Sequence, residues 1–174
     1  QLLHGLDLGG AAQVKAMKKV SGTLKLDLAQ YRDQQAFSMF ASDLDPATRR
    51  QLARGERLME LLKQPQYSPY PVEEQVVSIW AGSKGHLDEV PVQDVLRFER
   101  EFIDHLRRHT SVLTDIASTG KLEDGTVSAL ESAVAEFSKG FQSSEDGGVQ
   151  AGHEEHRAIE QDQVAQEQIT KQKR

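Results

Sequence analysis

The chain has 174 residues, of which 37% are hydrophobic, and this is typical of one globular domain with or without a tail. Lysine and arginine number 21 against 27 acidic residues, so the net charge of −6 argues against bulk binding of nucleic acid. The absence of cysteine excludes disulfides, thiolate metal sites and cysteine nucleophiles. No run approaches the roughly 18 apolar residues of a membrane span. The beginning also lacks a secretory pattern, so we expect a soluble, intracellular protein with no membrane insertion.

Apolar residues recur every three or four positions along most of the chain, which predicts helices. The first predicted helix is short and covers residues 11–20. Gly22 is expected to interrupt it, and a second helix follows from Leu24 to about Phe40. The acidic turn Ser42–Pro46 then ends this helix and starts another.

The middle of the chain alternates between helical and Pro-rich segments. Residues 47–63 are predicted to be helical, whereas residues 64–71 hold three of the five prolines and cannot be. Residues 72–81 are dense in large apolar side chains and are the expected centre of the core. A loop is predicted over residues 82–90.

Two further helices are predicted after this loop. The first starts at Pro91 and continues to a stop at Gly120, with a buried stripe formed by Val95, Phe98, Phe102, Ile103 and Leu106. The last uses Val127, Leu130, Val134, Phe137 and Phe141. Residues 143–174 contain no aromatic residue and are rich in Gln, Glu and Gly, so we expect a poorly ordered tail. The predicted fold class is an all-α, multi-helical bundle.

The histidines give a weak case for a metal site. His105 and His109 are spaced i, i+4, which places two imidazoles on one helix face and can bind a transition metal. However, no HExxH pattern or third ligand is present, and Arg107 and Arg108 oppose cation binding. A solvated pair is therefore the favoured interpretation, and a small metalloenzyme ranks last among the functions considered.

Paired carboxylates precede or begin several predicted helices: Asp43 with Asp45, Glu73 with Glu74, and Asp88 with Glu89. Negative charge at a helix start complements the helix dipole, so capping or solvation is the expected role of each pair. The turn between the two long helices is also a candidate contact surface, since exposed charged turns are common functional sites. No P-loop or Ser/His/acid constellation is present, and no catalytic residue is predicted.

Three segments carry a resemblance to a known family. They are GGAAQVKAMKKVSGTLKLDLAQYRDQQAF, SDLDPATRRQLARGERLMELLKQPQYSPYPVEEQVVSIWAG and GHLDEVPVQDVLRFEREFIDHLR. Together they closely resemble the α subunit of F-type ATP synthase, at the end of its nucleotide-binding domain and through its C-terminal helical domain. The resemblance implies three parts: a remnant of the nucleotide-binding domain over residues 1–22, the helical domain over 23–142, and an extension over 143–174 like that of actinobacterial forms.

This resemblance implies a non-catalytic, regulatory subunit of the F1 sector. Three α and three β subunits alternate around a γ shaft in the family, on the cytoplasmic face of the bacterial plasma membrane, and support ATP synthesis coupled to proton transport. The turn made by Asp43, Leu44, Asp45 and Pro46 would then be a partner contact that approaches the rotor. The tail would restrain ATP hydrolysis by touching the rotor.

The resemblance also implies a nucleotide site that is not hydrolytic. Gln64 and Gln66 match the family's glutamines at the adenine end of that site, which holds ATP or ADP with Mg in the full-length subunit. Side-chain amides can donate and accept toward a purine edge, and nearby prolines stiffen the loop.

The beginning of the chain departs from the family. Asp7 stands where the family has an arginine that stabilises the transferring phosphoryl group, and residues 1–8 are atypical throughout. The β-barrel and the P-loop have no counterpart in the sequence. The chain alone is therefore expected to bind no cofactor and to be catalytically inactive. The alternative is an independent helical interaction module that docks partners through Trp80 or through the tail.

Overall fold

The computed structural model describes residues 14–39, 43–63 and 70–144. Within these ranges the chain forms six α-helices and one short 3₁₀ helix and no strand, which confirms the all-α prediction. The chain divides into two units, Gln1–Phe141 and Gln142–Arg174, and every helix described below lies in the first. None of the helices in the described ranges is both long and apolar enough to cross a membrane. The tail prediction falls almost wholly outside the described residues.

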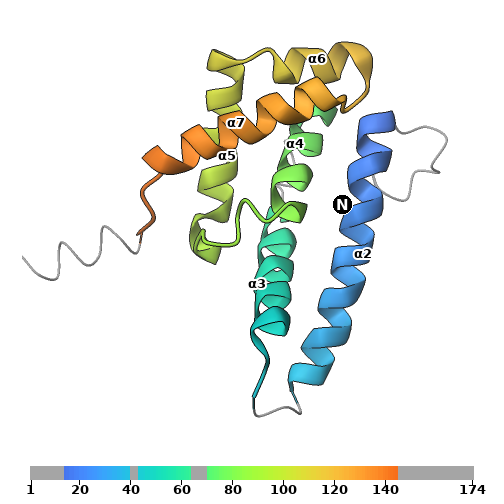
Figure 1. Cartoon of the computed structure of the whole chain (residues 1–174), viewed down its shortest axis with the longest axis vertical. Coiled ribbons are helices and arrows are strands. Elements are labelled where there is room, and N and C mark those ends of the chain that lie inside the picture. Colours follow the sequence, from blue (N-terminus) through green and yellow to red (C-terminus); the bar gives the residue numbers. More distant parts are fainter. Residues whose placement is uncertain (1–13, 40–42, 64–69, 145–174) are drawn as a thin grey trace, which may run out of the picture. The chain divides into compact units, whose positions relative to one another are not determined.

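Three helices form one side of the first unit. α2 (Lys15–Ser38) and α3 (Pro46–Leu61) are joined by a turn and pack against each other, and α4 (Val72–Ser83) contacts both. Figure 1 shows α2 and α3 side by side, with the end of α2 and the start of α3 far from α6 and α7.

The predicted interruption at Gly22 is wrong, because α2 runs through it as one helix of 24 residues. A helical glycine costs about 1 kcal/mol relative to alanine. Buried side chains on both sides of Gly22 offset this cost: Ala16, Met17, Val20, Leu24 and Leu28. Within the segment that resembles the end of a separate domain, residues 15–22 are thus continuous with the helical domain, and three of them, Ala16, Met17 and Val20, pack in its core.

The remaining helices are η1 (Val92–Asp94), α5 (Val95–His109), α6 (Val112–Thr119) and α7 (Asp124–Gly140). The single helix predicted from Pro91 to Gly120 is wrong, because it breaks at Thr110, whose backbone is extended. The Thr110 hydroxyl donates to the carbonyl of Leu106 (2.8 Å), which satisfies one of the last carbonyl groups of α5. The predicted stop at Gly120 is confirmed by its left-handed φ of +63°.

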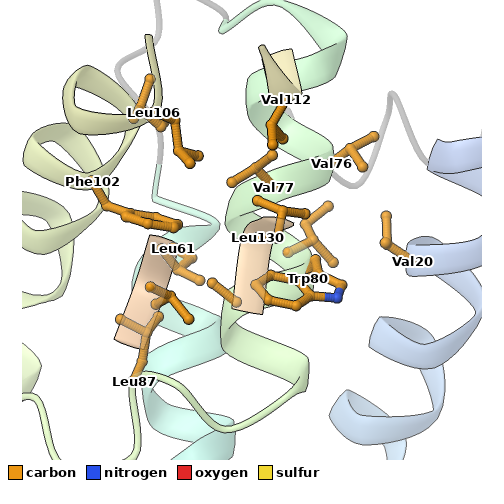
Figure 2. Packing of buried hydrophobic residues seen from close by; sticks show 14 of the residues in the cluster. Val20, Leu61, Val76, Val77, Trp80, Leu87, Phe102, Leu106, Val112 and Leu130 are labelled. Carbon is orange, nitrogen blue, oxygen red and sulfur yellow. The ribbon is translucent and has the colours of Figure 1, made fainter. Parts of the chain in front are cut away.

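The core centres on α4, as predicted. Val76, Val77, Ile79 and Trp80 are at most 3% exposed, and Figure 2 shows side chains from the surrounding helices converging on this segment. The predicted stripes of α5 and α7 are buried or packed against the same cluster. Trp80 is only 3% exposed, so the alternative in which Trp80 and its neighbours dock a partner has little indole surface to offer.

Candidate functional site

The turn between α2 and α3 holds the four predicted contact residues, and one of them has a defined local role. Asp45 is the N-cap of α3: its Oδ1 accepts from the backbone N–H of Ala47 (2.9 Å) and of Thr48 (3.0 Å). Its Oδ2 accepts from the Thr48 hydroxyl (2.6 Å). Pro46 occupies the first helical position, where its missing N–H costs nothing. The predicted acidic cap with proline just inside the helix is confirmed.

These hydrogen bonds also favour the charged form of the Asp45 carboxyl group. The Thr48 hydroxyl, followed by the Thr48 backbone N–H, lowers the pKa of Asp45 below its ordinary value of 3.8. Asp43 is exposed, and Leu44 is half-buried. The turn therefore presents the ionised Asp45 carboxylate at a capped helix start. Whether these residues touch a partner stays a prediction.

Sequence reasoning missed two exposed apolar side chains beside this turn. Phe37 is 65% exposed and Met39 is 81% exposed at the end of α2. Phe37 is out of register with the buried Leu24 and Leu28 stripe, and this offset was the available sequence signal. Met39, the C-cap of α2, follows the register of that stripe and gave no such signal. We call Phe37, Met39 and residues 43–46 the hairpin tip. Its apolar side chains next to carboxylates are a mixed surface of the kind that binds protein.

The two arms behind the hairpin tip are held together closely. Gly55 of α3 faces the Tyr31 ring and Cβ atom of α2 so tightly that a side chain at Gly55 would overlap them. Further toward the tip, the Gln34 amide donates to the Gln51 side-chain oxygen. The absence of a side chain at Gly55 therefore lets α2 and α3 approach each other closely.

The second predicted site, Gln64 and Gln66, lies outside the described residues, and their role stays a prediction. The described chain resumes at Tyr70, close to the start of α4. The carbonyl of Tyr70 accepts from the Gln75 side-chain amide (2.6 Å), which fastens the end of the Pro-rich segment to α4. Burial, and then the charge of Glu99, raise the pKa of Tyr70.

Glu99 is the most unusual charged residue of this region. It is 4% exposed, and burial raises its pKa to about 7 from an ordinary value of 4.5. No hydrogen bond of ordinary geometry reaches either carboxyl oxygen within the described residues, and the nearby Ser78 hydroxyl only partly offsets the effect of burial. Neither feature was visible in the sequence, where Glu99 lies between two predicted core phenylalanines.

Two of the carboxylates expected to cap helices or face solvent are instead paired. Glu74 lies in the first turn of α4 but is buried, and its Oε1 accepts from Arg107 Nη2 of α5 (2.5 Å). Asp88 accepts two hydrogen bonds from Arg54 of α3, at 3.1 and 2.5 Å. The expectation was wrong for both residues because their partners lie 33 and 34 positions away in the chain.

The histidine pair has a packing role on one side. The His105 and His109 rings lie 4.7 Å apart between centroids, and His105 also packs on Phe137 at 5.6 Å. His109 is exposed and His105 is partly buried, so the expected solvation holds for His109 and only in part for His105. Within the described ranges no group of three or more potential ligands could hold a metal ion.

The comparisons with known proteins agree with this architecture. Residues 13–137 match the family model described as the ATP synthase alpha/beta chain, C-terminal domain. The chain belongs to this family. The matched range includes every helix from α2 to most of α7, with the hairpin tip and the ion pairs described above. The matched range therefore contains all of the buried hydrophobic residues of the described core.

Three relatives share high identity with this member of the family. ATP synthase subunit alpha of Renibacterium salmoninarum is 66% identical over 170 residues, which is 96% of this chain and 31% of that protein. The proteins of the same name from Pseudarthrobacter chlorophenolicus and Kocuria rhizophila are 65% and 63% identical, over 96% and 94% of this chain and 31% and 30% of their own lengths. The chain thus spans about a third of the relatives that it matches, and the similarity extends beyond the range of the family model.

Proposed function

We propose that this chain acts as the C-terminal helical domain of an ATP synthase α subunit in the F1 sector, a non-catalytic part that supports rotary ATP synthesis coupled to proton transport. The hairpin tip carries this proposal: it combines a capped helix start at Asp45 with exposed Phe37 and Met39 on two closely packed arms. Its partners are the β and γ subunits, at the cytoplasmic face of the bacterial plasma membrane.

A chimeric subunit tests the proposal directly. The part of the Renibacterium salmoninarum α subunit that matches residues 13–174 is replaced by those residues of this chain, so that the host's own residue remains at the position of Asp7. The chimera is coexpressed with the β and γ subunits of the same organism. We expect an assembled complex that hydrolyses MgATP. If the chimera folds but remains outside the complex, the proposal is contradicted, and the independent interaction module takes its place.

Substitutions at the tip then separate contact from folding. Phe37→Ser with Met39→Ser removes the exposed apolar surface of the tip, and we expect MgATP hydrolysis to fall about threefold to tenfold. Leu26→Ser is the matched control, because Leu26 is 59% exposed on the same helix and lies two turns or more from the tip. Equal effects of the tip and control substitutions would contradict the contact role.

The nucleotide part of the proposal rests on Gln64 and Gln66, whose family counterparts hold the adenine end of a non-catalytic site. Gln64→Ala and Gln66→Ala in the assembled chimera are each expected to weaken nucleotide binding there about twofold to tenfold. The chain alone is expected to bind MgATP no better than buffer controls. Tight binding by the chain alone would show that the site does not need the rest of the subunit.

A further inference from the structure

A cavity of about 130 Å³ opens between α2, the end of α4 and the start of α7. Its walls are apolar, formed by Val20, Leu122, Val127 and the indole of Trp80. Within the described residues that line it, two side chains are cationic, Lys19 and Lys84, and none is a carboxylate; Thr23 and Ser83 add hydroxyl groups. The cavity thus pairs an apolar interior with a positive rim, in a chain whose net charge is −6.

The walls of this cavity are fixed by hydrogen bonds and close packing. The backbone N–H of Ala16 donates to the carbonyl of Gly120 (2.9 Å), which ties the start of α2 to the turn before Leu122. On α4, one face of the Trp80 ring stacks on His86, with ring centroids 4.9 Å apart. The cavity is therefore largely preformed, which lowers the entropic cost of filling it.

The Trp80 side chain adds an unsatisfied donor. Its Nε1 atom is buried and has no hydrogen-bond partner within the described part of the chain. Figure 2 shows the nitrogen-bearing edge of the ring turned toward α2 and Val20, and both Trp80 and Val20 line the cavity. A buried N–H group without an acceptor is costly, and the ring that carries it lines the cavity, so its NMR signal is sensitive to what fills the cavity.

We infer that this cavity binds a small organic carboxylate with one apolar ring or an apolar body of equal size. The volume of the cavity sets the size of the ligand, because a cavity of about 150 Å³ holds one benzene ring. The two lysines set the chemical class of the ligand. Its carboxylate would meet Lys19 and Lys84, while its apolar part would cover Val20 and Leu122. None of the described residues that line the cavity belongs to the hairpin tip, so the inference does not depend on the proposed function of that tip.

The single tryptophan provides a specific probe. Benzoate is titrated into the ¹⁵N-labelled full chain while the Trp80 indole N–H signal is followed by NMR. A saturable shift with a Kd on the order of 1 mM is expected for a ligand of this size. Benzyl alcohol, which has the same ring without the charge, is expected to bind at least about threefold more weakly. A signal that never saturates, or equal binding of the two compounds, would overturn the inference.

Variants test the positive rim. Lys19→Gln and Lys84→Gln are each expected to raise the Kd for benzoate about twofold to fivefold. Lys18→Gln is the matched control, since Lys18 is exposed on the same helix but does not line the cavity. Equal weakening by the Lys18 variant would assign the effect to net charge alone and overturn the inference. If a variant unfolds, as measured by circular dichroism, the comparison of benzoate with benzyl alcohol on the unchanged chain still decides.

Discussion

Two helical glycines are expected to respond in opposite directions to alanine. Gly22 lies inside α2, and a Cβ atom added there meets no neighbouring heavy atom within 4 Å. Gly55 lies inside α3, and a Cβ atom added there would lie 2.7 Å from the Cβ of Tyr31 and closer still to the ring atoms Cγ and Cδ2. The first position is open, whereas the second is closed by the opposite arm of the hairpin.

The magnitudes follow from two competing effects. Alanine is about 1 kcal/mol more favourable than glycine inside a helix, so Gly22→Ala stabilises the fold by up to that amount. Gly55→Ala gains the same propensity but overpacks the α2–α3 contact, which costs about 1–3 kcal/mol or more. Relief would require moving the backbone of α2 and not a flexible side-chain end, so the upper end of this range applies. The net effect at Gly55 is a loss of about 2 kcal/mol.

Thermal unfolding of the full chain, followed by circular dichroism, measures both variants. The difference of about 3 kcal/mol corresponds to midpoints separated by roughly 6–12 °C, with Gly22→Ala above the unchanged chain and Gly55→Ala below it. In a Tyr31→Ala background the ring clash is gone, so the cost of Gly55→Ala is expected to shrink by at least about 0.5 kcal/mol. If Gly55→Ala stabilises the chain as Gly22→Ala does, the close approach of α2 and α3 is refuted.

Three further predictions concern charged residues. Because burial raises the pKa of Glu99 to about 7, its contribution to stability is full below pH 4.5 and is lost as the pH rises through 7. Glu99→Gln should remove this pH-dependent loss of stability. If the urea midpoints of the unchanged chain and the variant differ by the same amount at every pH between 4.5 and 7, the prediction is refuted. Arg107→Ala leaves the buried Glu74 carboxylate without this partner. We expect the free energy of unfolding, measured in urea, to fall by about 1 kcal/mol, a figure already reduced because Arg107 is exposed to solvent. Asp45→Ala should lower the urea midpoint and Asp43→Ala should not, because only Asp45 caps α3; equal effects contradict this.

The parts of the fold that depend on local patterns could be predicted from the sequence. The 3–4 spacing of Phe98, Phe102 and Leu106 identified the buried face of α5 because one face of a regular helix always recurs at that interval. The capped start of α3 at Asp45 and Pro46 was equally local, since both the cap and the proline act within one turn. These predictions needed no knowledge of what the helix packs against.

Predicted helix boundaries were wrong for two reasons. Burial of neighbouring side chains can outweigh a residue that disfavours helix, and a polar residue that ends a helix can be overlooked. Gly22 is a breaker by propensity, yet buried residues on both sides of it hold α2 together. At Thr110 the opposite happens, because its hydroxyl bonds back to α5 and Thr110-Ser111 precedes α6 as a start signal. That signal was readable, but the continued apolar spacing through Leu113 and Ile116 concealed it.

Buried polar groups were the least predictable feature, and the reason is physical. Glu74 and Glu99 have the same carboxyl group on neighbouring helices, but Glu74 meets Arg107 while Glu99 has no hydrogen-bond partner of ordinary geometry in the described part of the chain. Which outcome occurs depends on the helix that covers each residue, and that helix lies far away in sequence. The same holds for the Trp80 N–H, whose surroundings are fixed by the position of α2. Binding sites built from such groups arise only when the helices pack, so they must be sought in the structure.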